Sequence, residues 1–84
     1  MKAKQNSRTF RVIIEPDGKY FHAYAPALRG CHTFGKTITE ARERIREAME
    51  LHVSVMVDKG IQVPTDDSYE SFETVQLVGA GLYA

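Results

Sequence analysis

Several features are scarce in this sequence of 84 residues, and each scarcity excludes a class of protein. A single cysteine, Cys31, rules out an internal disulfide framework and suits a reducing cytosol, so we expect a cytoplasmic protein. No apolar run reaches the roughly 18 residues of a membrane span, and the N-terminus lacks the apolar core of a signal peptide. Eleven basic residues balance eleven acidic ones, so a surface wholly devoted to nucleic acid is not expected.

The chain has room for one small domain, which we assign to residues 1–84, with the polar residues 1–7 expected to be flexible. A domain of this size buries only a modest fraction of its surface, so its stability is expected to be marginal. Self-association would increase the buried area.

Alternating apolar residues predict a β-hairpin near the N-terminus. Its strands are residues 9–15 and 20–25, joined by a turn at residues 16–19 in which Gly18 tolerates a positive φ. A second turn closes on Gly30, and residues 31–35 form a short third strand. The second strand presents two faces, Tyr20, His22, Tyr24 and Phe21, Ala23, Ala25. One face belongs under a helix, and the other is an exposed surface that could bind a partner.

A long helix follows. Thr37 and Glu40 form a capping box in which each side chain accepts a hydrogen bond from a backbone N–H that would otherwise lack a partner. Apolar residues recur at three- and four-residue steps from Ile38 to Met56, and Gly60 occupies the position where a helix-ending glycine belongs. The predicted helix is about 22 residues long.

Residues 73–78 predict a last strand, with Val75 and Leu77 on one face. The fold class is therefore α+β with the order β-β-β-α-β. A right-handed crossover places the fourth strand parallel to the first, which gives the strand order 3-2-1-4 with the helix on one face. The other face is uncovered, and both outer strands are free edges.

The turn, strand and cap between Pro26 and Glu40 carry a resemblance to a known family, the HicB antitoxins of HicA/HicB toxin–antitoxin pairs. The matching residues are Phe10, Val12, Ile14, Glu15, Asp17, Gly18, Tyr20, Ala23, Pro26, Leu28, Gly30, Cys31, Thr33, Gly35, Thr37, Glu40, Ala41, Arg46, Glu47, Ala48, Leu51, Gly60 and Pro64. In this order and spacing they resemble a short, stand-alone HicB-like domain. Arg29 replaces the proline that often precedes the Gly-Cys pair, which alters the turn but not the topology.

The resemblance implies a partial ribonuclease H-like fold without catalysis. It also implies a protein partner, the small basic toxin HicA, an mRNA ribonuclease whose active site the antitoxin covers. Many family members carry a further C-terminal module that binds operator DNA. About twenty residues follow Pro64 here, too few for a helix-turn-helix, which argues against DNA binding.

A metal-dependent nuclease is the enzymatic alternative, because ribonuclease H-like nucleases hold metal with carboxylates on the first strand, the helix and the fourth strand. The corresponding residues are Glu15, Glu40, Glu43, Glu47 and Glu73. Two-metal chemistry requires these groups to converge. Glu15 lies at a turn and Glu40 already acts as a cap, so a solvated surface is the favoured interpretation and we expect no catalytic residues.

The histidines and the cysteine offer no clear site. His22, His32 and His52 lie on two strands and a helix without metal-ligand spacing, although His22 and His32 can be neighbours on one sheet face. Cys31 and His32 are adjacent in a strand and point to opposite faces, so they cannot form a nucleophile pair. The sequence therefore predicts no metal and no cofactor.

The interpretation that follows is a non-catalytic HicB-like antitoxin that binds and occludes a HicA-type ribonuclease. The alternative is an orphan regulatory or structural module that binds another protein or a small ligand. We also predict a homodimer, or a tetramer of dimers, because the end of the chain is unusually apolar. The residues expected to take part are Val75, Leu77, Val78, Leu82 and Tyr83.

Overall fold

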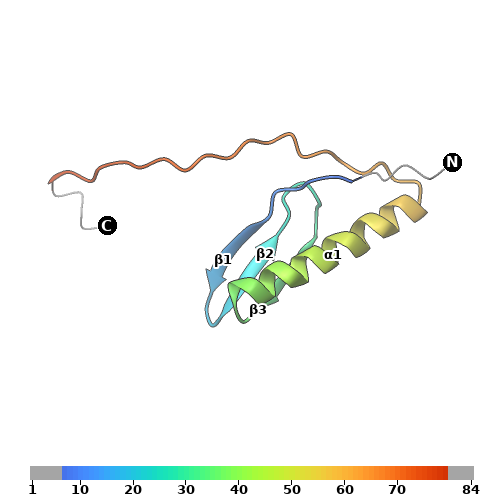
Figure 1. Cartoon of the computed structure of the whole chain (residues 1–84), viewed down its shortest axis with the longest axis horizontal. Coiled ribbons are helices and arrows are strands. Elements are labelled where there is room, and N and C mark those ends of the chain that lie inside the picture. The colour runs from blue at the N-terminus through green and yellow to red at the C-terminus, as the bar shows by residue number, and fades with distance from the viewer. Residues whose placement is uncertain (1–6, 80–84) are drawn as a thin grey trace.

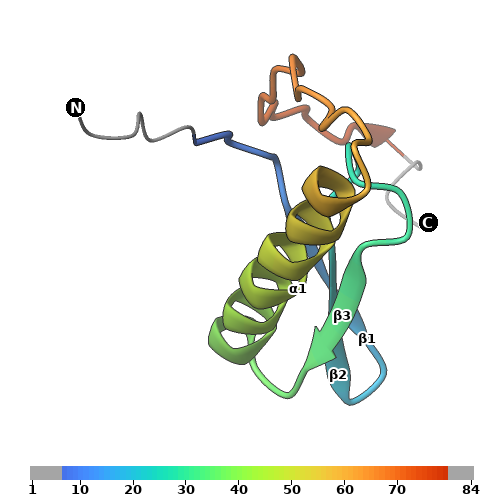
Figure 2. The same ribbon diagram turned by 90° about the vertical axis from the view of Figure 1, so that its right-hand side faces the viewer.

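A single helix covers one face of a three-stranded antiparallel sheet in the computed structural model, which describes residues 7–79 (Figure 1; Figure 2). The elements are β1 (Ile13–Asp17), β2 (Tyr20–Tyr24), β3 (His32–Gly35) and α1 (Ile38–Asp58). The α+β class and the order β-β-β-α are confirmed. Within the described residues, no helix combines the length and the apolar character needed to cross a membrane.

The predicted hairpin is present, with a tighter loop than expected. Asp17 pairs with Tyr20, so only Gly18 and Lys19 form the turn, and Gly18 has a φ of 63°. A glycine with positive φ at the first loop position is typical of the two-residue turns that match the twist of paired strands. The first strand begins at Ile13 rather than residue 9, because Tyr24 is its last partner on β2 and Ala25 bonds to Cys31 instead.

The loop before β3 is closed by short backbone hydrogen bonds. The amide of Leu28 donates to the carbonyl of Ala25 at 3.0 Å, and the amide of Cys31 donates to the carbonyl of Leu28 at 3.0 Å. Gly30 has a φ of 79°, as predicted for a residue that closes this turn. The loop thereby turns the Leu28 side chain into the core, where it is 1% exposed.

Both predicted ends of the helix are confirmed. Thr37 is the N-cap, and its Oγ1 accepts from the Glu40 amide at 3.0 Å. In a capping box the Glu40 carboxylate would accept from the Thr37 amide. Here it accepts instead from the amide of the preceding residue, Lys36, at 2.6 Å. At the other end, Gly60 (φ 71°) donates to Val57 and the following amide donates to Met56. This pair of bonds is a Schellman motif, which satisfies two terminal carbonyls.

The core is small, and it depends on a close approach between β3 and α1. Its buried members are Ala23, Ala25, Leu28, Cys31, Ala41 and Ile45. A Cβ added to Gly35 would lie 2.3 Å from the Ala41 amide nitrogen, so only glycine allows the strand to approach the first turn of the helix this closely. As a result α1 packs over β3 and β2 and touches β1 much less.

The strand order 3-2-1 is as predicted, but residues 73–78 form no strand, so the fourth position of the predicted order 3-2-1-4 is empty in the single chain. We call residues 8–61 the body and residues 62–79 the tail. The tail crosses the N-terminal end of the body and then runs away from it as an extended chain (Figure 1). Arg8 donates to the Val63 carbonyl at 3.1 Å, and the Arg11 amide donates to Asp66 Oδ2 at 2.7 Å.

A strand requires a neighbour to pair with, and these contacts direct the tail away from the free edge of β1. The ribonuclease H-like arrangement, which depends on the fourth strand, is therefore not present in the described chain. Of residues 1–7, which were expected to be flexible, only Ser7 lies within the described residues, and it is exposed. Leu82 and Tyr83, which were expected to take part in self-association, also lie outside the described residues.

Candidate functional site: the open face of the sheet

The face of the sheet opposite α1 carries most of the aromatic side chains of the body. Strand alternation and register bring eight side chains to this side, which we call the open face. They are Ile13, Glu15, Asp17, Tyr20, His22, Tyr24, His32 and Phe34. On the opposite side Ile14 and Phe21 pack against the core, together with Phe10 and Val12 from the segment before β1, as predicted.

Four aromatic rings of the open face, those of His22, Tyr24, His32 and Phe34, form one connected cluster. His22 lies opposite Phe34 in the strand register and stacks on it, with ring centroids 4.8 Å apart. The His22 ring also stacks on Tyr24 at 5.2 Å and meets His32 edge-on at 5.3 Å. Stacked and edge-on pairs at these distances are favourable beyond the area they bury. The cluster is therefore an ordered surface rather than a set of independent side chains.

The two histidines of the cluster come together, as the sequence allowed. His22 Nε2 and His32 Nδ1 are 3.4 Å apart, within reach of a hydrogen bond whose direction depends on the tautomer. His52 lies on α1, and among residues 7–79 no three side chains with metal-binding groups converge. The structure thus brings together two of the three predicted candidates, as part of an aromatic surface.

Two carboxylates line the cluster, and one arginine borders it: Arg29, in the loop before β3, lies beside His22, Tyr24 and His32. Glu15 lies opposite His22, and Asp17 lies opposite Tyr20 at the end of the hairpin. No lysine or arginine is among the side chains that the register assigns to the open face. Exposed aromatic rings attract cationic groups through their π faces, and acidic side chains attract them through their charge. The open face is therefore suited to a basic protein surface.

The carboxylates considered for metal chemistry are not brought together. Glu15 lies on the open face, Glu73 lies in the tail, and Glu40 is occupied at the start of α1. Glu40 accepts from the Lys36 amide and forms an ion pair with Arg44, at 3.7 Å. Arg44 also donates to the Phe34 carbonyl at 3.1 Å, which ties the end of β3 to the helix. Glu40 and Arg44 therefore have a structural role at the start of α1.

Cys31 and His32 are separated as predicted. The Cys31 side chain is 5% exposed within the core, whereas His32 is exposed on the open face. Burial raises the pKa of the Cys31 thiol, because the apolar surroundings disfavour the thiolate. A protonated, buried thiol is a packing group.

Two features escaped the sequence analysis. Gly35 was quoted in the resemblance without a role, and its packing against Ala41 depends on a close approach that no local pattern reveals. The anchoring of the tail by the Arg8 side chain and the Arg11 amide joins residues 55 positions apart in the chain, and no local pattern reveals a contact over that separation.

Comparison with known proteins agrees with this geometry. Residues 10–76 match the sequence profile of a family described as HicB-like antitoxin of bacterial toxin–antitoxin systems. A UPF0150 protein of Synechocystis is 43% identical over 60 residues, which cover 69% of this chain and 75% of that protein. A UPF0150 protein of Thermoplasma acidophilum is 32% identical over 59 residues, covering 70% of this chain and 86% of its own length.

A similar structure is the crystal structure of the N-terminal domain of the antitoxin HicB from Burkholderia pseudomallei. It superposes with a TM-score of 0.62 at 30% sequence identity, and the match covers 71% of this chain and 72% of that one. The sheet and helix described above are thus shared with an antitoxin domain.

Proposed function

The chain belongs to the HicB-like antitoxin family, and on this basis we propose that it binds a small toxin ribonuclease of the HicA type and covers its active site. The observation that carries the proposal is the open face, whose strand side chains combine exposed aromatic rings with two carboxylates and include no lysine or arginine. A ribonuclease that binds RNA presents basic groups to the phosphates of its substrate. The open face is complementary to such a surface.

The proposed mechanism is steric and electrostatic occlusion without catalysis. Phe34 and Tyr20 are 41% and 47% exposed, so burial of their rings under a partner would supply apolar area at the centre of the contact. Glu15 and Asp17 would pair with basic side chains of the toxin and guide the encounter. RNA and the open face would then compete for the same basic groups.

The remaining parts of the proposal concern the setting in which the protein works. We propose a cytoplasmic protein that acts as a homodimer or as a tetramer of dimers and that regulates its partner without binding DNA. The completed domain would be a partial ribonuclease H-like fold once a fourth strand joins β1. An orphan module would use the same open face for a different protein, and no described feature favours that alternative.

Co-expression with a small basic toxin of the HicA type tests the proposal. We expect the two proteins to copurify, and we expect Phe34→Arg to abolish copurification, because it places a cation and a bulky side chain at the contact. Glu50→Ala, on the exposed side of α1, is the control and should copurify normally. Normal copurification of the Phe34→Arg variant would show that the open face is not the binding site.

A further inference from the structure

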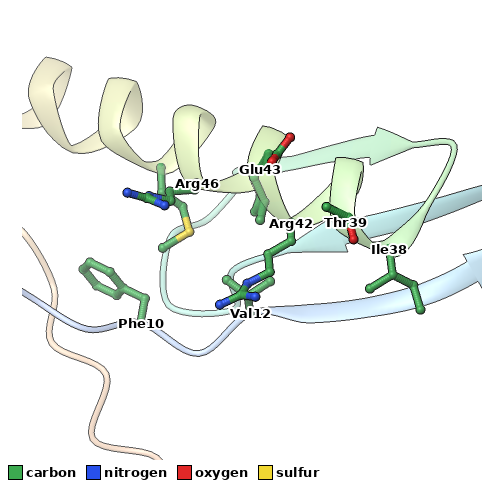
Figure 3. A pocket seen from close by; sticks show the side chains of 9 residues that line it. Phe10, Val12, Ile38, Thr39, Arg42, Glu43 and Arg46 are labelled. Atoms are coloured by element: carbon green, nitrogen blue, oxygen red, sulfur yellow. The ribbon is translucent and has the colours of Figure 1, made fainter.

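A groove lies between the helix and the segment that leads into β1. It has a volume of about 580 Å³ and is lined by Phe10, Val12, Ile38, Thr39, Arg42, Glu43, Ile45, Arg46 and Met49. Figure 3 shows Phe10 and Val12 on the leading segment, with Ile38, Arg42 and Arg46 facing them from the helix. The groove exists because α1 is drawn toward β3 by the Gly35 contact and leaves β1 partly uncovered.

The floor of the groove borders an unpaired sheet edge. β1 has β2 as its one neighbour in the sheet, so its other side presents backbone N–H and C=O groups without ladder partners. An occupant that is extended can pair with this edge while its side chains fill the space under the helix. The groove is therefore shaped for a β-strand rather than for a compact ligand.

The tail has the chemistry that this groove requires. It is extended, and its large apolar side chains are almost fully exposed, with Phe72 90%, Val75 76% and Leu77 69% exposed. Its charged residues are all acidic, namely Asp66, Asp67, Glu70 and Glu73. The groove offers Arg42 and Arg46, and the one ion pair within residues 7–79 joins other residues, Arg44 and Glu40.

We infer that the groove of each chain binds the tail of a second copy, which adds residues 73–78 as a fourth strand parallel to β1. Glu73, Val75 and Leu77 share one face of such a strand. In the parallel direction we place Glu73 beside Arg46, and Val75 and Leu77 against Val12 and Ile38, which line the groove. Two tails exchanged across a two-fold axis would fill both grooves and pair both edges.

A second copy is favoured over the chain's own tail by the path that the tail takes. Arg8 and Arg11 hold residues 63–66 against the body, and the tail then extends beyond the end of the body (Figure 1). If extended, residues 67–79 reach roughly 40 Å, which is enough to cross to a neighbouring domain. The inference rests on the proposed self-association and is independent of the proposed toxin.

Light scattering on the full chain without toxin tests this inference. We expect about twice the 9.5 kDa chain mass at micromolar concentration, and half of that dimer mass for Val75→Asp/Leu77→Asp and for Arg46→Glu. The combination Arg46→Glu with Glu73→Arg should restore the dimer, which a variant that merely misfolds cannot do. Leu51→Glu, on the opposite side of the helix beside β3, is the matched control and should remain dimeric.

A mixing experiment separates exchange of tails from other kinds of dimer. The Arg46→Glu variant has an altered groove and a normal tail. The Val75→Asp/Leu77→Asp variant has a normal groove and an altered tail. Mixed together, the two monomers should form a heterodimer through the one intact groove and the one intact tail. A monomeric wild-type chain, a dimer unaffected by these variants, or two variants that fail to complement each other would overturn the inference. Each of these results leaves toxin binding by the open face untouched.

Discussion

The body and the tail differ in the burial of apolar side chains: the body has a buried apolar core, and the tail has none among its described residues. In the body, Ala23 and Ala41 are completely buried and Ile45 is 1% exposed, whereas Tyr69 in the tail is 98% exposed. These core groups of the body are buried because the hairpin, the Leu28 loop and the helix close around one another within the same chain. The tail carries side chains of the same kind without a surface of its own to cover them.

The difference indicates which interactions each region supplies. The body is a self-contained folding unit, and its stability depends on a few close contacts. The tail adds apolar side chains that only association can bury, and a group of exposed apolar side chains is typical of an interaction site. Substitutions in the body should therefore change stability, and substitutions in the tail should change assembly.

Gly35→Ala should cause the largest loss of stability. The new Cβ would lie 2.3 Å from the Ala41 amide nitrogen, and neither backbone can move without separating β3 from the helix. We expect a loss of about 4 kcal/mol in the free energy of unfolding, measured by urea denaturation. Gly18→Ala is the control, since nothing lies within 4 Å of its Cβ position and only its φ of 63° opposes the change. Its expected cost is about 1 kcal/mol, and equal losses would disprove the role of Gly35.

A matched pair of truncations compares the two regions directly. Ile45→Ala should lower the free energy of unfolding by about 3 kcal/mol, because it leaves a cavity in the core. Leu77→Ala should change the stability of the isolated chain by less than about 0.5 kcal/mol, because the side chain is 69% exposed. Denaturation at a concentration below the dimer transition is the measurement. A large loss for Leu77→Ala would mean that the tail packs on its own body.

Removal of the helix cap should have a smaller effect. Thr37→Ala deletes the hydroxyl that accepts from the Glu40 amide, and we expect a loss of about 1 kcal/mol in a thermal or urea unfolding experiment. Ser54→Ala, at an exposed position near the C-terminal end of α1, is the control and should leave stability unchanged or slightly raise it. A Thr37→Ala variant as stable as the wild type would refute the cap assignment.

The smallest expected effect is a pH-dependent release of the tail. The Ser68 hydroxyl, the Arg11 amide and the Ser68 amide donate to Asp66, and these bonds lower the pKa of its carboxyl below the ordinary value. Because the pKa is lowered, the contact is fully present above the ordinary aspartate pKa and is lost as the pH falls through the lowered one. The Arg11 amide resonance should report this transition in an NMR titration. Asp66→Asn should abolish the transition, and a transition that persists in that variant would assign it to another group.

The parts of the fold that local chemistry determines were predictable from the sequence. Thr37, Glu40 and Gly60 marked the ends of the helix, and the Asp17-Gly18 pair marked the hairpin, because caps and turns depend on neighbouring residues. Periodicity also assigned the two faces of β2 correctly, so the aromatic face opposite the helix could be anticipated.

The remaining features depend on contacts between distant segments. Residues 73–78 have the alternation of a strand, but alternation does not reveal whether a partner edge is available within the same chain. The groove beside β1 results from the position of the helix, which Gly35 and Ala41 determine together. No local pattern brings the side chains of Arg42 and Arg46 beside Phe10 and Val12; the three-dimensional arrangement does.

The most direct test of the central claim is a titration of RNA cleavage by the toxin with three forms of the chain. The account predicts complete protection by the wild-type chain and by Val75→Asp/Leu77→Asp, at about one chain per toxin, and no protection by Phe34→Arg. That result would assign toxin binding to the open face of the body and leave self-association to the tail. Protection by Phe34→Arg together with loss of protection in the tail variant would contradict the account.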